Sequence, residues 1–387
     1  MKVLFTTLRE KSHFLAMVPF VEAFRRTGHD VAVAAPEDLA ERVAEAGVRF
    51  FPMGHPGTEG LRPLNERIGK APRDQVTRMV MSELFAGACA GAAIPSVVEM
   101  LESFRPAVLL RESHEFAGLV AAEKVGVPHV RVAICAQGAE AEIRGYAAAS
   151  VDAHLRAIGL PSDPEASRIR DEEAVTLFPP SFEPPETATA RVHRFRLPQR
   201  EAPPLPDWWG TQPGPFVYVT FGTVAGSFDM LRAKYREILD ALDGAPVRAL
   251  LTIGASLPFD ALGAVPSNVH VERFVPQHEV LPHAAAVVCH GGSGTVHGAL
   301  AAGAPLVVTP MFADQPYNAE RIAAVGAGLA TRQLEASPEA VRAAILRVVE
   351  EPSFRDVAQR FSREIASLPL VDEAARALEA IAARPRH

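Results

Sequence analysis

One pattern recurs along this chain: a short apolar, β-branched run is followed by a loop, a helix-forming segment, a glycine and another apolar run. In the first copy, residues 3–8 and 31–35 are the predicted strands, residues 15–26 the helix, and Gly28 follows it. Further copies occupy residues 39–51 and 116–134. Strands joined in this way form right-handed crossovers. The chain is therefore predicted to be an α/β protein with doubly wound parallel sheets.

The pattern stops in a proline-dense stretch between residues 187 and 215 and restarts at residues 216–222. The length of 387 residues is enough for two domains. A sheet on each side of the proline-dense stretch predicts two domains with a linker between them. The predicted boundaries are 1–197 for the first domain, 198–214 for the linker, 215–365 for the second domain and 366–387 for a C-terminal helix.

The composition fits a large enzyme with two cores, since 48% of residues are hydrophobic and 22% charged. The net charge is −7 and no lysine or arginine cluster occurs, so a nucleic-acid partner is not expected. We find no signal peptide and no apolar run of the ~18 residues that span a membrane. The scattered Cys89, Cys135 and Cys289 predict neither a disulfide framework nor a zinc site. A cytoplasmic location is expected.

A glycine-rich turn lies between an apolar strand, residues 284–289, and a helix predicted over residues 296–302. The turn has the sequence His290-Gly-Gly-Ser-Gly-Thr295. Glycines let a ligand approach the backbone, and the first amides of a helix lack intrahelical partners, so the turn can bind an anion such as a diphosphate. Such turns also occur for packing reasons alone.

Two further segments flank this turn in a fixed order. Residues 274–277, with the sequence Phe-Val-Pro-Gln, precede it, and Asp314-Gln315 follow the apolar strand at residues 305–310. All three segments come at carboxyl ends of predicted strands, where open α/β sheets bind ligands.

Together these segments, which span about fifty residues, resemble the donor-binding signature of glycosyltransferases that use nucleoside-diphosphate sugars. Plant secondary-metabolite enzymes and bacterial antibiotic-tailoring enzymes share this family. The resemblance implies the GT-B fold, in which two Rossmann-like domains face each other across a cleft and the last helix crosses back to the first domain. The donor-binding residues that it implies are Thr223, Val275, Gln277, His290, Gly292, Ser293, Gly294, Thr295, Asp314 and Gln315.

The resemblance also implies a role for each group of these residues. The turn residues, with His290 and Thr223, would bind the diphosphate. Val275 and Gln277 would lie beside the base, and Asp314 and Gln315 would bind sugar hydroxyls. Ordinary helix capping is the alternative role for the hydroxyl and carboxylate side chains.

His13 stands in the loop after the first strand, where the family has the histidine that deprotonates the acceptor hydroxyl. An imidazole titrates near neutrality and suits this role. Many relatives have glycines before this histidine, whereas this chain has residues Arg9 to Ser12. A carboxylate must orient such a base. Glu112, at the end of the strand over residues 107–110, is our choice, with Glu115 as the alternative.

The acceptor would contact loops at residues 54–74 and 137–163 and the apolar helix over residues 75–104. Phe14, Met79 and Phe85 are the predicted acceptor-binding residues. Methionine and phenylalanine at helical spacing also fit a plain core. A flat polyketide, phenolic or macrolide-like acceptor would suit an apolar pocket.

Other enzyme classes find less support. A dehydrogenase needs G-x-G-x-x-G after the first strand, and the loop here has no glycine. No Asp-x-Asp pair of metal-dependent sugar transferases occurs, so neither a metal nor another cofactor is expected. Plant relatives place a ribose-binding Glu where this chain has Gly298, and its absence is compatible with a thymidine-diphosphate deoxysugar.

The sequence thus predicts an inverting glycosyltransferase that moves a sugar from a TDP or UDP donor to a small hydrophobic natural product. The alternatives are a nucleotide-sugar epimerase of the same fold and a non-catalytic partner of a sister transferase. A homodimer is left open.

Overall fold

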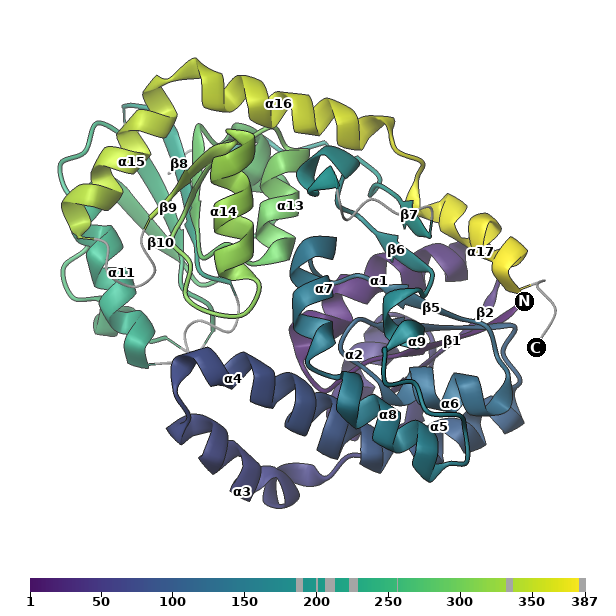
Figure 1. Ribbon diagram of the computed structural model, residues 1–387. Coiled ribbons are helices and arrows are strands. Elements are labelled where there is room, and N and C mark those ends of the chain that lie inside the picture. The colour runs from purple at the N-terminus through teal and green to yellow at the C-terminus, as the bar shows by residue number, and fades with distance from the viewer. Residues whose placement is uncertain are drawn as a thin grey trace. The chain divides into compact units, whose positions relative to one another are not determined.

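The computed structural model describes residues 1–185, 191–199, 201–205, 213–222, 229–255, 257–331 and 337–382. The chain forms two compact units (Figure 1). Unit 1 comprises Met1–Leu177, Pro184–Pro198 and Pro369–His387, and unit 2 comprises Phe178–Glu183 and Gln199–Leu368. Part of the predicted linker, and Thr223, lie outside the described residues.

Unit 1 is built on a seven-stranded parallel sheet in the order β3-β2-β1-β4-β5-β6-β7. Its register places Val3 beside both Val31 and Val108. Successive strand residues point to opposite faces. The strands are β1 (Lys2–Thr6), β2 (Asp30–Ala35), β3 (Arg49–Pro52), β4 (Val108–Glu112), β5 (His129–Val132), β6 (Ala174–Thr176) and β7 (Val192–Arg194).

Helices cover both faces of this sheet, which gives unit 1 two apolar layers. Val3 and Phe5 pack against α1 and α17, whereas Leu4 packs against α5 and α6. The helices are α1 (Lys11–Arg26), η1 (Glu37–Leu39), α2 (Ala40–Glu45), α3 (Gly57–Lys70), α4 (Arg73–Met79), η2 (Val80–Cys89), α5 (Ala90–Phe104), α6 (Ala117–Val125), α7 (Gln137–Gly145), α8 (Ala148–Ala157), α9 (Ser167–Arg170), η8 (Val371–Glu373) and α17 (Ala374–Ala382).

The C-terminal helix α17 belongs to unit 1 and packs on α1. Arg26 Nη2 donates to Asp372 Oδ1 over 2.8 Å at this contact. Conversely, the short segment Phe178–Glu183 belongs to unit 2, although it falls within the predicted first domain. The reason is local packing: the rings of Phe182 and Phe361 lie 6.1 Å apart, and Arg321 donates to the Phe182 carbonyl.

Unit 2 has a six-stranded parallel sheet in the order β10-β9-β8-β11-β12-β13. The two sheets confirm the predicted α/β architecture. The strands are β8 (Phe216–Thr220), β9 (Arg248–Thr252), β10 (Val269–Glu272), β11 (Ala286–Cys289), β12 (Leu306–Val308) and β13 (Gly328–Ala330).

Helices α11 and α15 pack together on one face of this sheet, where they form the main apolar core, while α13 packs against α14 and α16. The helices of unit 2 are η3 (Pro180–Phe182), α11 (Asp229–Leu242), η6 (Phe259–Leu262), α12 (Gln277–Val280), η7 (Leu281–His283), α13 (Ser293–Ala301), α14 (Gln315–Val325), α15 (Pro338–Glu350) and α16 (Pro352–Ser367).

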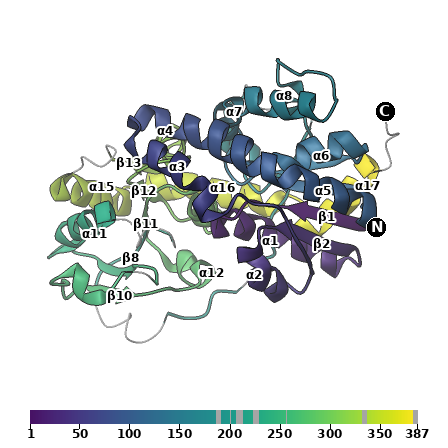
Figure 2. The same ribbon diagram turned by 90° about the horizontal axis from the view of Figure 1, so that it is seen from below.

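A long apolar helix runs through α4, η2 and α5, as Figure 2 shows. Its middle part, η2, is π-helical, a form that is rare and often found at functional sites. Contrary to the sequence-based expectation, the helix Asp74–Phe104 is long and apolar enough to cross a membrane by length and composition. Half of its most apolar window is buried inside the structure, and a buried core helix passes the same test of length and composition.

Candidate active site

Unit 1 has a topological switch point between β1 and β4. After β1 the chain passes to β2, and after β4 it passes to β5 on the opposite side. The loops that leave two such neighbouring strands diverge, and a ligand can bind at their carboxyl ends. His13, in the first turn of α1 after β1, and Glu112, the last residue of β4, come from these two positions.

The side chains of His13 and Glu112 form a pair. His13 Nδ1 lies 3.1 Å from Glu112 Oε1, and the histidine side chain is 16% exposed whereas the carboxylate is fully buried. Burial opposes ionisation of Glu112, but the electrostatic interactions and hydrogen bonds of His13 and His114 together outweigh it and hold the pKa of this carboxyl below its ordinary value. Because a carboxylate only accepts, the pairing places the ring proton on Nδ1 and makes Nε2 the basic nitrogen.

Glu115, the alternative to Glu112, lies elsewhere. It accepts from Thr6 Oγ1 at 2.5 Å and from the Gly118 amide at 2.9 Å, and so ties β1 to the start of α6. A Cβ at Gly118 would lie 2.5 Å from Glu115 Oε2, so this contact requires glycine. Burial raises the pKa of Glu115. The structure thus assigns the His13 pairing to Glu112.

A buried ion cluster, formed by Arg111, Arg131, Arg144, Glu140 and Glu172, supports the turn that carries Glu112. Glu172 accepts from Arg111 and Arg144 at 2.7 Å and lies 3.0 Å from Arg131 Nε. Arg131 also pairs with Glu140 on α7. Arg111 Nη1 donates to the carbonyls of residues 112, 113 and 115. No sequence pattern predicted this cluster beyond the presence of charged residues in apolar surroundings.

Of the three predicted acceptor-binding residues, Phe85 lies next to His13. Its ring centroid is 6.0 Å from that of His13, and it belongs to the π-helical η2. Phe14 is 2% exposed and packs in the core with Met17, contrary to the prediction, because it points from α1 to the sheet. Met79, the last residue of α4, is half-buried and stays a prediction.

His114 was not among the predicted site residues, yet it lies beside this pair. Its ring centroid is 5.5 Å from that of His13 and 6.3 Å from that of Phe85. Ligand atoms of His13, Glu112 and His114 lie within 4.8 Å of one another, a spacing at which a cation could bind. Both oxygens of Glu112 already accept hydrogen bonds, from His13 and from the His114 amide, and a cation would displace them.

Unit 2 has a switch point of the same kind between β8 and β11, and the glycine turn follows β11. The His290 ring lies between two glycines: Cβ atoms at Gly222 and Gly292 would lie 3.1 and 2.5 Å from its Nε2. Burial lowers the pKa of His290, against the opposing effects of Asp314 and the Thr220 backbone. A neutral imidazole can still donate one N–H to a phosphate oxygen.

The helix after the turn, α13, begins at Ser293, earlier than predicted. Gly291 has a φ of +90°, and a Cβ there would lie 2.7 Å from Val308 Cγ1. By contrast, a Cβ at Gly294 would meet open space, and this residue lies in the first turn of the helix. Packing therefore explains Gly291, while Gly294 leaves room for an anion at the helix N-terminus.

Asp314 braces the glycine turn through one of its two carboxylate oxygens, and its predicted role of binding a sugar hydroxyl stays a prediction. Its Oδ2 accepts from the amide and Oγ of Ser293, at 3.1 and 2.6 Å, and from Asn318 Nδ2 at 3.0 Å. Asn318 also donates to the Gly291 carbonyl. Ser293 thus directs its hydroxyl to Asp314 rather than to a phosphate. Asn318 was missed, although its spacing of four from Asp314 places both on one helix face.

Gln315 has structural hydrogen bonds as well, and its predicted contact with the sugar stays a prediction. The side chain is 4% exposed, and its Oε1 accepts from the amides of Met311 and Phe312. It therefore shapes the loop that precedes α14. Ala313, in the same loop, has a φ of +57°, a strained conformation for a residue other than glycine.

Gln277 begins α12, and its Nε2 donates to Thr295 Oγ1 on α13 over 3.1 Å. Val275 is half-buried just before it. Phe274 was not among the predicted site residues, yet its side chain is 67% exposed after β10 and can contact the face of a base. The sequence feature that could have indicated Phe274 is its position as the aromatic first residue of the Phe-Val-Pro-Gln segment.

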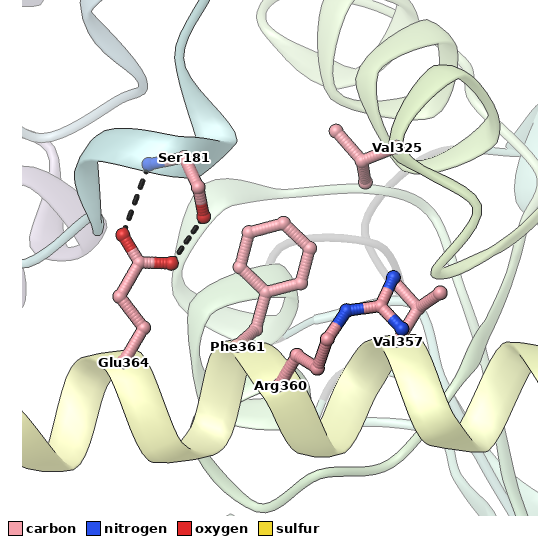
Figure 3. A pocket seen from close by; sticks show the side chains of 6 residues that line it. All are labelled: Ser181, Val325, Val357, Arg360, Phe361 and Glu364. Atoms are coloured by element: carbon pink, nitrogen blue, oxygen red, sulfur yellow. Dashed lines mark hydrogen bonds between the residues drawn. The ribbon is translucent and has the colours of Figure 1, made fainter.

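A pocket of about 220 Å³ lies elsewhere in unit 2, between η3, α14 and α16 (Figure 3). Its lining residues are Ser181, Val325, Val357, Arg360, Phe361 and Glu364. None of the predicted site residues is among them. Ser181 bonds to Glu364 across it through both its amide and its hydroxyl.

Comparisons with known proteins identify the family of this chain. The N-terminal domain described as erythromycin biosynthesis protein CIII-like matches residues 22–222, and the C-terminal domain of the same description matches residues 237–381. L-demethylnoviosyl transferase of Streptomyces niveus is 30% identical, with 95% of each chain covered. Aklavinone 7-beta-L-rhodosaminyltransferase of Streptomyces galilaeus is 28% identical, and the alignment covers all of this chain and 97% of that protein.

Solved structures show the same fold. Glycosyltransferase VinC in complex with DTDP has a TM-score of 0.77 and 26% identity, with both chains fully covered. The calicheamicin glycosyltransferase CalG4 has a TM-score of 0.79 at 23% identity over 99% of this chain and 98% of its own. The GT-B fold is thereby confirmed, and the chain belongs to the erythromycin biosynthesis protein CIII-like family of antibiotic-biosynthesis glycosyltransferases.

Proposed function

We propose that this protein is an inverting glycosyltransferase that moves a sugar from a nucleoside diphosphate to a hydroxyl of a hydrophobic natural product. The observation that carries the proposal is the His13–Glu112 pair at the switch point of unit 1. Unit 1 would bind the acceptor and unit 2 the donor. A cytoplasmic location and a homodimer stay predictions.

In the proposed reaction, His13 Nε2 takes the proton of the acceptor hydroxyl. The oxygen attacks the anomeric carbon, and the bond from that carbon to the diphosphate breaks, so the nucleoside diphosphate leaves with the electron pair. Attack from the opposite face inverts the carbon. Glu112 stabilises the imidazolium that forms, because it is ionised and buried beside Nδ1.

The donor would bind at the glycine turn of unit 2. The amides at the start of α13, the open space over Gly294 and the neutral His290 supply hydrogen-bond donors for the diphosphate. These groups would stabilise the leaving group without a metal ion. Phe274 and Val275 would contact the base. Asp314 Oδ1 would serve a sugar hydroxyl, because every described hydrogen bond to this carboxylate goes to Oδ2.

We propose a thymidine diphosphate donor ahead of a uridine one. Gly298 takes the place of a ribose-binding carboxylate, and a Cβ there would lie 3.1 Å from Leu281 Cδ1, so the site has little room for a larger residue. The complex of VinC with DTDP supports the same choice. An epimerase, or a partner without activity, is less favoured because the relatives are named as transferases.

The experiment compares wild type with His13→Ala, and with His270→Ala, which changes an exposed histidine of β10. Transfer by His13→Ala should fall by roughly 10²–10⁴-fold, while His270→Ala stays near wild type. Thermal stabilisation by thymidine diphosphate should be equal in all three proteins, since His13 lies in unit 1 and the exposed His270 lies outside the glycine turn of unit 2. Near-normal transfer by His13→Ala would show that His13 is not the base that deprotonates the acceptor. Turnover of donor alone would indicate an epimerase.

A further inference from the structure

His114 has a buried ring nitrogen that the proposed mechanism does not use. The residue is 7% exposed, and within the described part of the chain its Nε2 has no hydrogen-bond partner. Its backbone amide donates to Glu112 Oε2 over 3.0 Å, which fixes the residue in the turn after β4. Burial lowers the pKa of His114 to about 3, so the imidazole is neutral at neutral pH.

The ring of His114 lies beside two other rings, those of His13 and Phe85. The His13 ring meets it at 65° and the Phe85 ring is nearly parallel to it, at 16°. His13 and Phe85 meet at 74°. These contacts hold His114 at the proposed base, next to an apolar ring.

An unpaired buried polar atom costs roughly 1–3 kcal/mol, and native proteins rarely keep one without a use. Glu112 already orients His13, so His114 is not needed as the acid of that pair. A polar group that arrives with the substrate would satisfy the nitrogen.

We propose that His114 is an acceptor-binding residue, whose Nε2 forms a hydrogen bond with a second oxygen substituent of a planar aromatic acceptor while the reacting hydroxyl lies at His13. The proposal rests on the proposed function and deepens it. The faces of Phe85 and His114 would contact the acceptor ring system, and the Nε2 bond would set which hydroxyl reaches the base. The acceptor class is therefore a phenol with a second oxygen substituent next to the reacting hydroxyl.

The test uses alizarin, which carries adjacent hydroxyls on an anthraquinone, and 2-hydroxyanthraquinone, which lacks one of them. Binding to wild type, His114→Phe and His114→Gln is measured by calorimetry, and transfer is measured with saturating donor. His114→Phe keeps a planar ring against Phe85 and removes the nitrogen. His114→Gln restores a hydrogen-bonding group.

We expect His114→Phe to weaken alizarin binding by roughly 5- to 150-fold and to raise KM in step, with a smaller effect on kcat. The same change should affect 2-hydroxyanthraquinone little, and His114→Gln should recover part of the loss. Thymidine diphosphate should stabilise all three proteins equally, because unit 2 is unaltered.

Equal affinity of wild type and His114→Phe for alizarin would overturn the proposal, as would failure of wild type to bind either compound. A loss confined to kcat, with a shifted pH profile, would make His114 a positioning residue for His13 instead. Zn²⁺ inhibition of wild type that His114→Phe relieves, with unchanged alizarin affinity, would identify a cation site. If alizarin binds as expected but no sugar is transferred, the proposed function fails while this inference stands.

Discussion

Replacement of Glu172 by Gln should strongly destabilise unit 1. The carboxylate accepts from Arg111 and Arg144 at 2.7 Å and lies 3.0 Å from Arg131, and all four side chains are at least nine-tenths buried. Glutamine has nearly the same shape as glutamate but no charge. The three buried guanidinium groups would then lose the carboxylate that neutralises part of their positive charge. Removal of one partner from a buried ion pair typically costs about 3–5 kcal/mol.

This loss can be measured by urea unfolding followed by circular dichroism. With a slope of roughly 2 kcal/mol per molar urea, the expected loss moves the midpoint by roughly 1.5–2.5 M. Glu123→Gln is the matched control, since Glu123 is 30% exposed and pairs with His129 and Arg168. It should cost at most about 1 kcal/mol. A midpoint for Glu172→Gln no lower than that of the control would refute the reasoning.

The same variant should also lower transfer activity, because Arg111 holds the turn that carries Glu112 through three backbone carbonyls. Activity is measured under conditions in which calorimetry shows the variant to be folded. Full activity in the folded variant would show that the ion cluster is not needed to hold Glu112 beside His13.

Three further predictions concern single positions. Gly294→Ala should raise thermal stability slightly, because alanine favours a helix by up to about 1 kcal/mol and its Cβ meets open space, yet weaken thymidine diphosphate binding in calorimetry; unchanged affinity would place the phosphates elsewhere. Gly118→Ala should cost about 1–3 kcal/mol of unfolding free energy, because its Cβ would lie 2.5 Å from Glu115 Oε2 and Thr6 Oγ1; a smaller loss in chemical denaturation would show that this bond yields easily. His114, with a folded pKa of about 3, stays neutral when the unfolded chain takes up a proton near pH 6.5, so it contributes stability that is lost as pH falls from 6.5 towards 3. His114→Phe should reduce that loss by about 1.4 kcal/mol per pH unit in this window, and parallel stability curves for both proteins would contradict a neutral buried imidazole.

Much of the fold could be predicted because its signals are local. The alternation of apolar runs, helices and glycines indicated parallel sheets, and the order of strands and turns placed the glycine turn at the carboxyl end of β11. Gly291 shows why such a signal is reliable: its φ of +90° and its closeness to Val308 exclude most other residues. The helix over residues 75–104 was also predicted, although its π-helical middle part was not.

The candidate site was predicted only in part. Sequence position alone could not separate Glu112 from Glu115, which are three residues apart on one turn; the fold directs the first to His13 and the second to Thr6. Asp314 and Gln315 were expected to bind sugar hydroxyls. Their bonds to Ser293 and to the backbone of the preceding loop were not predicted, because they depend on how α13 and α14 pack.

The sequence by itself determined the two α/β sheets, the glycine turn and the presence of a histidine after β1, because each depends on neighbours within a few residues. Only the tertiary structure decided which side chains meet. His13 and Phe14 are adjacent on α1, but a helix turns about 100° per residue, so one reaches Glu112, 99 residues away, while the other enters the core. His114, Phe85 and the ion cluster around Glu172 likewise combine distant segments, and their contacts depend on side-chain directions that no local pattern encodes.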